Sequence, residues 1–378
     1  MPTDIVEDFK ALLARFNFLD KYKNMKIRRP KDISLIPFTK RLELQKWNPD
    51  NSPQRPLIFY EATGGKKGEN FFIGINKDSH NFMVKRAVSA IELMKVKKGD
   101  KCLNLLFSDL VERGITEYGA ILMSVGDVHN FKTLKLARDA VRLLNIKHVF
   151  ACPNLLWDVL LPLDKKHSIN KCMVSGELLL PWFVKYFYRV TGIELYNWYG
   201  SSGGFIAAQD DPNDKFMRIL DQGLYLEIVD KYGKASQSGE GYLVYTDLYN
   251  YSTPIIRYLL EDWVKIVKRG RRRYITVYAR KGDHFKLDGE LVYKGYIINE
   301  ICKILHSNKF LIVVNKAHNY QDMITIFLEE EHQDKKMAIE HFLMKNIGLR
   351  PAIRKLKETA IMNSLRTKGN IVDYRTHA

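Results

Sequence analysis

Short apolar runs alternate with segments of helical periodicity through the middle of the chain, and this alternation limits the possible folds more than any other feature. The predicted strands are 101–107, 120–125, 146–152 and 173–177, and the predicted helices are 80–98, 133–144 and 178–190. Strands that alternate with helices imply βαβ units and a mainly parallel sheet that is covered by helices on both faces. In such sheets, ligands bind at the carboxyl ends of the strands, where the connecting loops meet.

The pattern changes on both sides of this region. A helix is predicted within residues 4–24, and a short buried strand is predicted over 56–60. From Gly223 onward, apolar and polar residues alternate, which is typical of antiparallel strands. The sequence therefore predicts an α/β protein with a large N-terminal domain over 1–279, in which about 223–279 form a β subdomain.

Residues 280–378 have an order of their own. A predicted helix at 294–306 precedes strands at 310–314 and 323–329, and a helix at 334–347 precedes a short strand around Ala360. This order predicts a small α+β lid domain at the C-terminal end.

Charge and cysteine content limit the classes of function. The 60 Lys and Arg residues exceed the 43 Asp and Glu residues and leave a formal charge of +17. An excess of this size favours anionic partners such as nucleotides, coenzyme A, an acidic carrier protein or nucleic acid, although a generic lysine-rich surface explains much of it. The four cysteines are widely spaced, without a Cys-x-x-Cys pair, so free thiols are expected rather than zinc ligands or disulfides.

The sequence lacks features of export or membrane insertion. The first residues are acidic and have no apolar signal core, and no run of about 20 apolar residues is present. We therefore expect a cytoplasmic protein without a membrane span.

Two glycine-rich loops follow strand-like runs. The apolar run from Ile193 to Tyr199 leads into Gly200-Ser201-Ser202-Gly203-Gly204, whose backbone N–H groups and hydroxyls could hold a phosphate. An ordinary glycine turn between two core strands is the alternative for this stretch. The Tyr199 ring stands just before the turn, where it could cover a purine.

The second loop is Thr63-Gly64-Gly65-Lys66-Lys67-Gly68, directly after the strand predicted at 56–60. Glycines allow close backbone approach to a triphosphate, and Lys66 or Lys67 could neutralise its charge. The spacing is not that of a Walker loop, and a hairpin turn with solvated lysines fits it as well.

Four motifs, taken in order, resemble those of the adenylate-forming enzymes, most closely the branch of phenylacetate–CoA ligases and capsule-biosynthesis relatives. The motifs are Ser175-Gly176-Glu177-Leu178, Tyr196-Asn197-Trp198-Tyr199-Gly200-Ser201-Ser202-Gly203, the pair Gly239–Asn250 and Pro254–Asp262, and Arg280–Glu290. Each motif alone is weak, but their shared order makes the resemblance specific. It covers roughly residue 55 to the end of the chain.

The resemblance implies a reaction in two steps. A carboxylate attacks the α-phosphate of ATP to give an acyl adenylate and pyrophosphate, and a thiol then displaces AMP. ATP and Mg²⁺ are the implied cofactors, and coenzyme A or a carrier-protein phosphopantetheine arm is the implied acceptor. Because phosphoryl transfer depends on positioning and charge neutralisation, such a site needs backbone amides, hydroxyls and cations.

The resemblance also implies roles for individual residues. Tyr199 would stack on adenine, Ser201 and Ser202 would contact the α-phosphate, and Asp262 would accept both ribose hydroxyls. Arg280 would reach the ribose or phosphate. The implied nucleotide-binding residues are Thr63, Gly64, Gly65, Lys66, Ser175, Gly176, Glu177, Tyr199, Gly200, Ser201, Ser202, Asp262 and Arg280. For Arg257, we expect a structural pairing within the β subdomain.

The implied catalytic residues are Lys368 and Arg280, and the implied hinge between the half-reactions is Gly282-Asp283. No residue is assigned as a dedicated metal ligand.

Three departures from the family pattern are present. Gly203 stands where the family has an acidic residue that helps to hold Mg²⁺, so the metal would depend on phosphates, water or another carboxylate such as Glu177. The phosphate loop at residues 63–68 has lost hydroxyls. Lys368 precedes Gly369 instead of following a glycine, so its role is either shifted or lost. The departures leave open a slow, specialised or inactive enzyme.

The main hypothesis is an acid–thiol ligase that forms AMP. A carboxylic acid and an acidic acyl-carrier protein are the expected partners, whereas nucleic acid is not expected, and monomer and homodimer both stay open. The alternatives are a non-catalytic nucleotide-binding relative and an acyl-protein synthetase-like acyltransferase. The last type uses a C-terminal cysteine, and the last cysteine here is Cys302.

Overall fold

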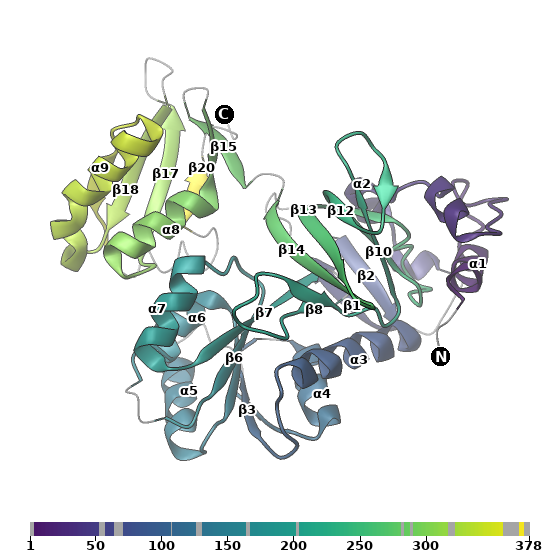
Figure 1. Cartoon of the computed structure of the whole chain (residues 1–378), viewed down its shortest axis with the longest axis horizontal. Helices are drawn as coiled ribbons and strands as arrows, with labels where there is room; N and C mark the ends of the chain where they lie inside the picture. The colour runs from purple at the N-terminus through teal and green to yellow at the C-terminus, as the bar shows by residue number, and fades with distance from the viewer. Residues whose placement is uncertain are drawn as a thin grey trace. The chain divides into compact units, whose positions relative to one another are not determined.

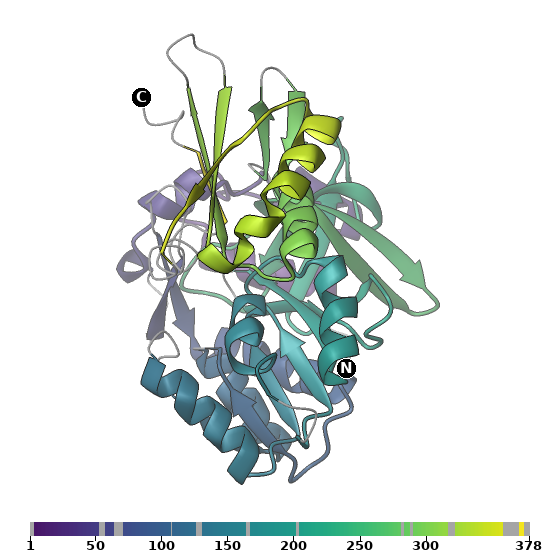
Figure 2. The same ribbon diagram turned by 90° about the vertical axis from the view of Figure 1, so that its left-hand side faces the viewer.

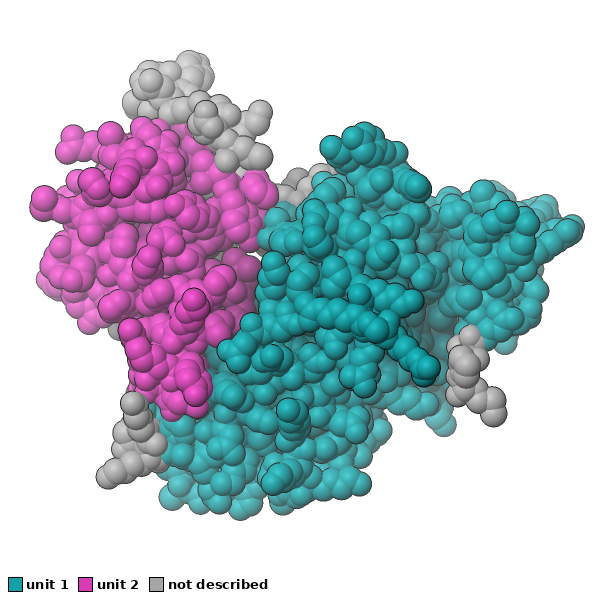
Figure 3. Space-filling model, in the orientation of Figure 1, with its two compact units in different colours: residues 1–152, 163–177, 193–280 teal, residues 153–162, 178–192, 281–378 magenta. Residues whose placement is uncertain are grey.

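The structure is a computed structural model (Figure 1). It describes residues 4–52, 57–63, 71–106, 108–125, 131–163, 167–201, 204–280, 283–287, 290–316, 322–357 and 370–373. Contacts divide the chain into two compact units (Figure 3). Unit 1 comprises Met1–Cys152, Leu163–Glu177 and Ile193–Arg280, and unit 2 comprises Pro153–Pro162, Leu178–Gly192 and Lys281–Ala378. The predicted domain boundary at 279/280 stays a prediction.

Unit 1 is built on one mixed sheet, which contains twelve strands within the described residues in the order β11-β10-β12-β13-β14-β9-β8-β7-β6-β5-β3-β4. The parallel part comprises β3 (Lys101–Asn104), β4 (Ile121–Ser124), β5 (His148–Ala151), β6 (Lys171–Val174) and the first half of β7 (Glu194–Ser201). The antiparallel part comprises β8 (Gly204–Ala208), β9 (Met217–Ile219), β10 (Leu224–Val229), β11 (Ala235–Ser236), β12 (Gly239–Asp247), β13 (Tyr258–Arg269) and β14 (Arg272–Arg280). The predicted α/β class is confirmed, and the predicted β subdomain is continuous with the parallel strands.

Helices cover the parallel strands on both faces. The chain goes from β3 to its neighbour β4 and then back across β3 to β5, so right-handed crossovers place α4 (Asp109–Tyr118) and α5 (Phe131–Leu143) on opposite faces. Figure 1 shows these two helices on either side of β3. Helix α3 (Lys77–Leu93) packs beside α4, and apolar residues of both join the buried core over β3, β5 and β6.

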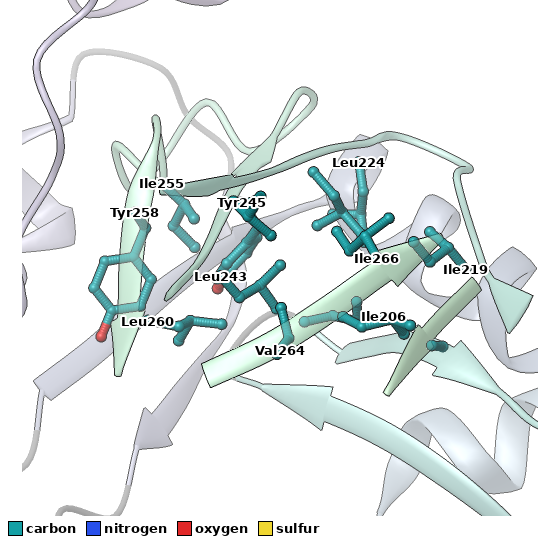
Figure 4. Packing of buried hydrophobic residues seen from close by; sticks show 14 of the residues in the cluster. Ile206, Ile219, Leu224, Leu243, Tyr245, Ile255, Tyr258, Leu260, Val264 and Ile266 are labelled. Carbon is teal, nitrogen blue, oxygen red and sulfur yellow. The ribbon is translucent and has the colours of Figure 1, made fainter. Parts of the chain in front are cut away.

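The antiparallel part has its own core, in which side chains from β8, β9, β10, β12 and β13 face one another (Figure 4). Along β13 the side chains of Tyr258, Leu260, Asp262 and Val264 are buried, and that of Glu261 is exposed. This alternation is the pattern expected of a strand with one buried face. Asp262 therefore lies on the same face as the core residues.

The N-terminal segment and a separate hairpin complete unit 1. The segment contains α1 (Ile5–Arg15), η1 (Pro30–Leu35), α2 (Arg41–Lys46) and η2 (Pro49–Asn51). The hairpin pairs β1 (Leu57–Thr63) with β2 (Phe71–Asn76) in antiparallel register. The strand predicted at 56–60 was expected to be buried, and this prediction is wrong. Ile58 and Tyr60 are exposed, because β1 lies in a two-stranded sheet with an open face. The helix predicted over 4–24 is also shorter, since α1 ends at Arg15.

Unit 2 contains an α+β sandwich. A four-stranded sheet of order β19-β18-β17-β20 combines β17 (Phe310–Lys316), β18 (Asp322–Leu328), β19 (Ala352–Lys355) and β20 (Ile371–Asp373). Helices α8 (Lys294–Leu305) and α9 (Lys336–Ile347) pack on it through a shared apolar core, and Figures 1 and 2 show them on one face. The unit also contains α6 (Pro153–Val159), α7 (Pro181–Thr191), η3 (Glu330–Lys335) and the hairpin of β15 (His284–Leu287) with β16 (Glu290–Tyr293). The strand predicted around Ala360 lies outside the described residues.

Candidate nucleotide site

Strand β7 changes its type of pairing where the candidate site begins. Asn197 still pairs in parallel with Val174 of β6, whereas Trp198 pairs in antiparallel register with Ala208 of β8. Tyr199, Gly200 and Ser201 therefore lie at the end of the parallel strands, where loops converge. This change of partner positions the Tyr199 side chain at the junction between the two halves of the sheet.

The predicted glycine loop is partly strand. Gly200 and Ser201 belong to β7, Gly204 begins β8, and Ser201 pairs with Gly204. A Cβ atom on Gly200 would lie 3.0 Å from the carbonyl oxygen of Gly204, and Gly204 has φ +93°, so glycine suits both positions. Ser202 and Gly203 lie outside the described residues. The predicted phosphate contacts of this loop stay a prediction.

The segment Ser175–Glu177 follows β6 at the same edge of the sheet. Ser175 is buried, and its backbone N–H donates to the carbonyl oxygen of Ala151 at 3.2 Å. Gly176 has φ +88°, and no atom lies within 4 Å of the position that its Cβ would occupy. Glu177 is exposed. The backbone of Gly176 therefore borders open space beside β7, because β6 and β7 are neighbours in parallel register.

Asp262 lies in β13 between two irregularities of the sheet. Tyr242 and Val244 of β12 pair with Trp263 and Leu259 of β13, so β13 holds two more residues than β12 over this stretch. A second register shift, between β13 and β14, follows at Trp263. Bulges of this kind bend a strand and redirect its side chains, and they are common next to active sites.

The structure brings together three residues that the motifs predicted. The Tyr199 hydroxyl donates a hydrogen bond of 2.6 Å to Oδ2 of Asp262, although the two residues are 63 positions apart in sequence. Arg280 pairs with Asp262 across the β13–β14 ladder, and its Nε lies 3.6 Å from Oδ1 of Asp262. The Asp262 carboxylate therefore accepts a hydrogen bond from Tyr199 on one oxygen and has the Arg280 guanidinium beside the other.

Burial dominates the electrostatics of this cluster. It raises the pKa of Tyr199 well above the ordinary value of 10.0, and the charge and hydrogen bond of Asp262 raise it further, whereas the charge of Arg280 lowers it. Burial also raises the pKa of Tyr245 on β12 well above its usual range. Both phenols therefore stay protonated at neutral pH, and Tyr199 is a hydrogen-bond donor to Asp262.

The other predicted residues are only partly described. Thr63 ends β1 and pairs with Phe71 of β2, whereas Gly64, Gly65 and Lys66 lie outside the described residues. Asp283 belongs to unit 2, where its carbonyl oxygen accepts a bond of 2.8 Å from the N–H of Lys294. Gly282 and Lys368 also lie outside the described residues. The assigned roles of Lys368 and the hinge stay predictions.

Arg257 has the expected structural role. Its guanidinium is buried and donates through Nε to Oε1 of Glu227 in β10 at 2.7 Å. It also donates to the carbonyl oxygen of Ser34 at 2.8 Å and lies over the Phe38 ring at 4.3 Å. The structural pairing predicted for Arg257 is confirmed, and it also connects the N-terminal segment to the antiparallel strands.

Other candidate groups lie apart from this cluster. Among the described residues, one set of possible metal ligands, Glu329, Glu331 and His332, has its ligand atoms within 4.8 Å of one another in unit 2. A cavity of about 270 Å³ in unit 1 is lined by the N-terminal segment, including Leu19, Thr39 and Trp47. Neither feature includes a residue that the resemblance assigns to the nucleotide site, although Pro254, the first residue of the Pro254–Asp262 motif, also lines the cavity.

Comparisons with known proteins support the motif-based resemblance at the level of fold. No protein-family profile matches the chain. An indoleacetate–lysine synthetase of Pseudomonas savastanoi is 23% identical over 277 residues, which cover 69% of this chain and 67% of that protein.

In the part of the chain that the structure describes, no helix is both long and apolar enough to cross a lipid bilayer.

Solved structures of acyl-activating ligases have the same architecture. The structure of 2-hydroxyisobutyryl-CoA ligase in the postadenylation state matches with a TM-score of 0.75 and 16% identity, over 98% of this chain and 86% of that chain. The amide bond synthetase McbA from Marinactinospora thermotolerans matches with a TM-score of 0.56 and 14% identity, over 80% of this chain and 68% of that chain. The chain therefore has the fold of the adenylate-forming ligases, the superfamily that its motifs resemble.

Proposed function

We propose that this protein uses ATP to activate a carboxylic acid as an acyl adenylate and then transfers the acyl group to a thiol with release of AMP. The contact of Tyr199 and Arg280 with the Asp262 carboxylate carries the proposal. These residues come from three motifs that resemble one family, and the fold of unit 1 joins them. Strands of an unrelated sheet would have no reason to place the Tyr199 and Arg280 side chains on one carboxylate.

The proposed first step is a displacement at phosphorus. A carboxylate oxygen of the acid attacks the α-phosphorus of ATP, and the bond between the α-phosphorus and the bridging oxygen breaks, so that pyrophosphate leaves. Asp262 accepts hydrogen bonds from the ribose hydroxyls, and the Tyr199 ring covers the adenine. Arg280 and Lys368 offset the charge that the phosphate oxygens carry during displacement. In the second step a thiolate attacks the acyl carbon, and AMP leaves.

Mg²⁺ would be held mainly by the phosphates and water. Its expected protein ligand is the exposed Glu177 carboxylate beside the open space at Gly176. Carboxylate oxygens and phosphate oxygens are the ligands that Mg²⁺ prefers. Coenzyme A is the expected acceptor in the second step, and a phosphopantetheine arm is the alternative thiol.

A second candidate function uses an amine as the acceptor. It is favoured by the similarity to an indoleacetate–lysine synthetase and to an amide bond synthetase, because amide formation consumes the same acyl adenylate. The acid and the acceptor are therefore separate questions for experiment.

The test is pyrophosphate release from ATP and Mg²⁺ with a panel of aryl, fatty and amino acids. Each acid is assayed alone, with coenzyme A and with lysine, and the Asp262→Ala variant serves as the inactive control. Pyrophosphate release that depends on the acid supports the proposal, and the product formed with each acceptor distinguishes thioester from amide. If no acid releases pyrophosphate while ATP raises the melting temperature, the protein is a non-catalytic nucleotide-binding relative and the proposed ligase activity is wrong.

A further inference from the structure

The cavity of about 270 Å³ in unit 1 has walls that are mainly apolar. They are formed by the side chains of Leu19, Leu44, Trp47 and Pro254. Ligand pockets are generally about 300–1,000 Å³ in volume and combine apolar and aromatic walls with a few polar groups that orient the ligand. The cavity is at the lower end of this range, so it suits a small molecule with an apolar body.

The groups that line this cavity are held in place by the rest of unit 1. The indole Nε1 of Trp47 donates to the carbonyl oxygen of Ser252 at 3.1 Å, and its ring packs edge-on against Phe16 with centroids 6.2 Å apart. Thr39, which also lines the cavity, forms a parallel bridge with Tyr258 of β13. A ligand would therefore enter a site whose walls are already ordered, which lowers the entropy cost of binding.

Hydrogen bonds at the polar end of the cavity favour a ligand that donates. The Thr39 hydroxyl donates its single proton to the carbonyl oxygen of Ile256 at 2.6 Å. It therefore accepts from Nζ of Lys21 at 3.2 Å and from the Tyr22 hydroxyl at 2.8 Å. Lys21 also donates to Oε1 of Glu43 at 2.6 Å, so two of its three N–H donors are engaged. The Glu43 carboxylate, in contrast, accepts only and has about four lone-pair positions.

The charges on the cavity wall favour a cation. Among the described residues that line it, the carboxylates of Asp20 and Glu43 and the ammonium of Lys21 carry charge, which leaves a net charge of −1. Burial acts to raise the pKa of Glu43, but the hydrogen bonds and charges of Lys21 and Lys40 lower it overall, so Glu43 is ionised at neutral pH. An anion that approached Lys21 would meet two carboxylates, whereas an ammonium group would be attracted by both.

We propose that this cavity binds a small organic amine in its ammonium form, with the charged group at Asp20 and Glu43 and an apolar body against Leu44 and Trp47. An aromatic body suits the site well, because aromatic rings pack favourably against an indole. The inference does not depend on the proposed ligase activity, since none of the residues that line the cavity is assigned to the nucleotide site.

The experiment uses three probes that share one aromatic body and differ in charge. They are 2-phenylethylamine, which is a cation at neutral pH, 2-phenylethanol, which is neutral, and 3-phenylpropionate, which is an anion. Isothermal titration of the full chain without ATP measures the three dissociation constants. The amine should bind about tenfold more tightly than the alcohol, and the carboxylate should bind more weakly than either. If the amine does not bind, or if the three probes bind with similar affinity, the inference is wrong.

Substitutions then locate the binding site. Asp20→Lys changes an exposed side chain and gives the cavity wall a net charge of +1, so the affinity for 2-phenylethylamine should fall about tenfold and 3-phenylpropionate should become the preferred probe.

Glu117→Lys makes the same change of charge at an exposed position of α4, away from the cavity wall, and should bind like the wild type. Leu19→Trp places a larger side chain at a half-buried position of the wall and should abolish binding of the amine. The melting temperature shows whether each variant is folded. Wild-type selectivity in Asp20→Lys, or amine binding that survives in folded Leu19→Trp, would overturn the inference without affecting the proposed ligase function.

Discussion

The Asp262 carboxylate is the group on which the candidate site depends. Its Oδ2 accepts the Tyr199 hydroxyl at 2.6 Å, and its Oδ1 lies 3.6 Å from Nε of Arg280. A buried carboxylate with such partners is held in one orientation, and a ribose can then approach without first ordering the acceptor. The side chain thus links the local packing of β13 to the nucleotide recognition that we propose.

Replacing Asp262 by Ala should therefore weaken nucleotide binding severely. The change removes the proposed ribose acceptor and leaves Arg280 beside a buried hydroxyl, so we expect a loss of AMP affinity of at least about tenfold. Isothermal titration with AMP measures this effect. Glu261→Gln, at the exposed neighbouring position, is the control and should bind AMP normally. Unchanged AMP affinity in Asp262→Ala would contradict the ribose contact.

The Tyr199→Phe variant separates the ring from its hydroxyl. The ring that would cover adenine is kept, but Asp262 loses a buried donor, so the free energy of unfolding should fall by about 1–3 kcal/mol. Urea unfolding followed by circular dichroism measures the change. Tyr232→Phe is a suitable control, because that side chain is 82% exposed. If Tyr199→Phe is as stable as the wild type, the hydrogen bond to Asp262 does not contribute in solution.

Residues of the site differed in how far the sequence could predict them. Tyr199, Asp262 and Arg280 lie in recognisable motifs, so their meeting could be expected from the sequence alone. The connection of the N-terminal segment to β13 could not be predicted, because no motif surrounds Thr39 and the connection depends on the bridge between Thr39 and Tyr258. A contact between segments so distant in sequence leaves no periodic pattern.

At the scale of elements, Arg257 fastens the N-terminal segment to the antiparallel strands. It has φ +47°, an uncommon value for a residue other than glycine, and its side chain pairs with Glu227. Burial raises the pKa of Glu227, although the nearby Arg257 charge lowers it. The pair is therefore poorly solvated, and each charge depends on the other.

Breaking this pair should be costly. Arg257→Met leaves the Glu227 carboxylate buried without its partner, so the free energy of unfolding should fall by about 3–5 kcal/mol. The double variant Arg257→Met/Glu227→Leu should recover part of the loss, since no charge is then left alone. Lys265→Met, which breaks the exposed pair with Glu240, should change stability far less than Arg257→Met. Equal, small effects in Arg257→Met and Lys265→Met would show that the buried pair is not a structural anchor.

The sequence predicted elements best where a periodic pattern is long. The helix over 178–190 and the strands of unit 2 at 310–314 and 323–329 match α7, β17 and β18 closely. Helix α4 was missed, although Gly119 at its C-terminal end, with φ +92°, is a recognisable stop. The burial of β1 was predicted wrongly because a short apolar run has the same composition in an open hairpin as in a covered sheet.

At the scale of the whole molecule, several buried tyrosines should limit stability in alkaline solution. Burial raises the pKa of Tyr22, Tyr199 and Tyr245 above 10.0 in the folded state. The unfolded chain releases these protons near pH 10, whereas the folded chain retains them. Their contribution to stability is therefore complete below about pH 10 and decreases as the pH rises above that value.

The free energy of unfolding, measured in urea between about pH 8 and pH 11, should fall above pH 10 with the slope expected for several protons. Absorbance at 295 nm should show that part of the tyrosines ionise only on unfolding. Tyr199→Phe should make the decrease less steep, and Tyr232→Phe should leave it unchanged. A stability that does not change over this range would mean that the phenols ionise equally well in the folded chain.

The overall class was predictable, and the continuity of the sheet was not. Alternating strands and helices indicated the α/β class directly. Strand β7, however, pairs in parallel with β6 and in antiparallel register with β8, and β9 spans only Met217–Ile219. Such short connecting strands carry too few alternations to be recognised, so the sequence suggested two separate regions where one sheet runs through both.

The extra residues of β13 opposite β12 make strand length itself a functional constraint. Because successive side chains of a strand point to opposite faces, removing a single residue between Leu259 and Asp262 would leave one extra residue instead of two and would turn the side chains on one side of the deletion to the opposite face. The Asp262 carboxylate and the buried side chains that precede it in β13 could then no longer share one face of the strand. Chain length in this short stretch therefore matters to the chemistry as much as the identity of its amino acids.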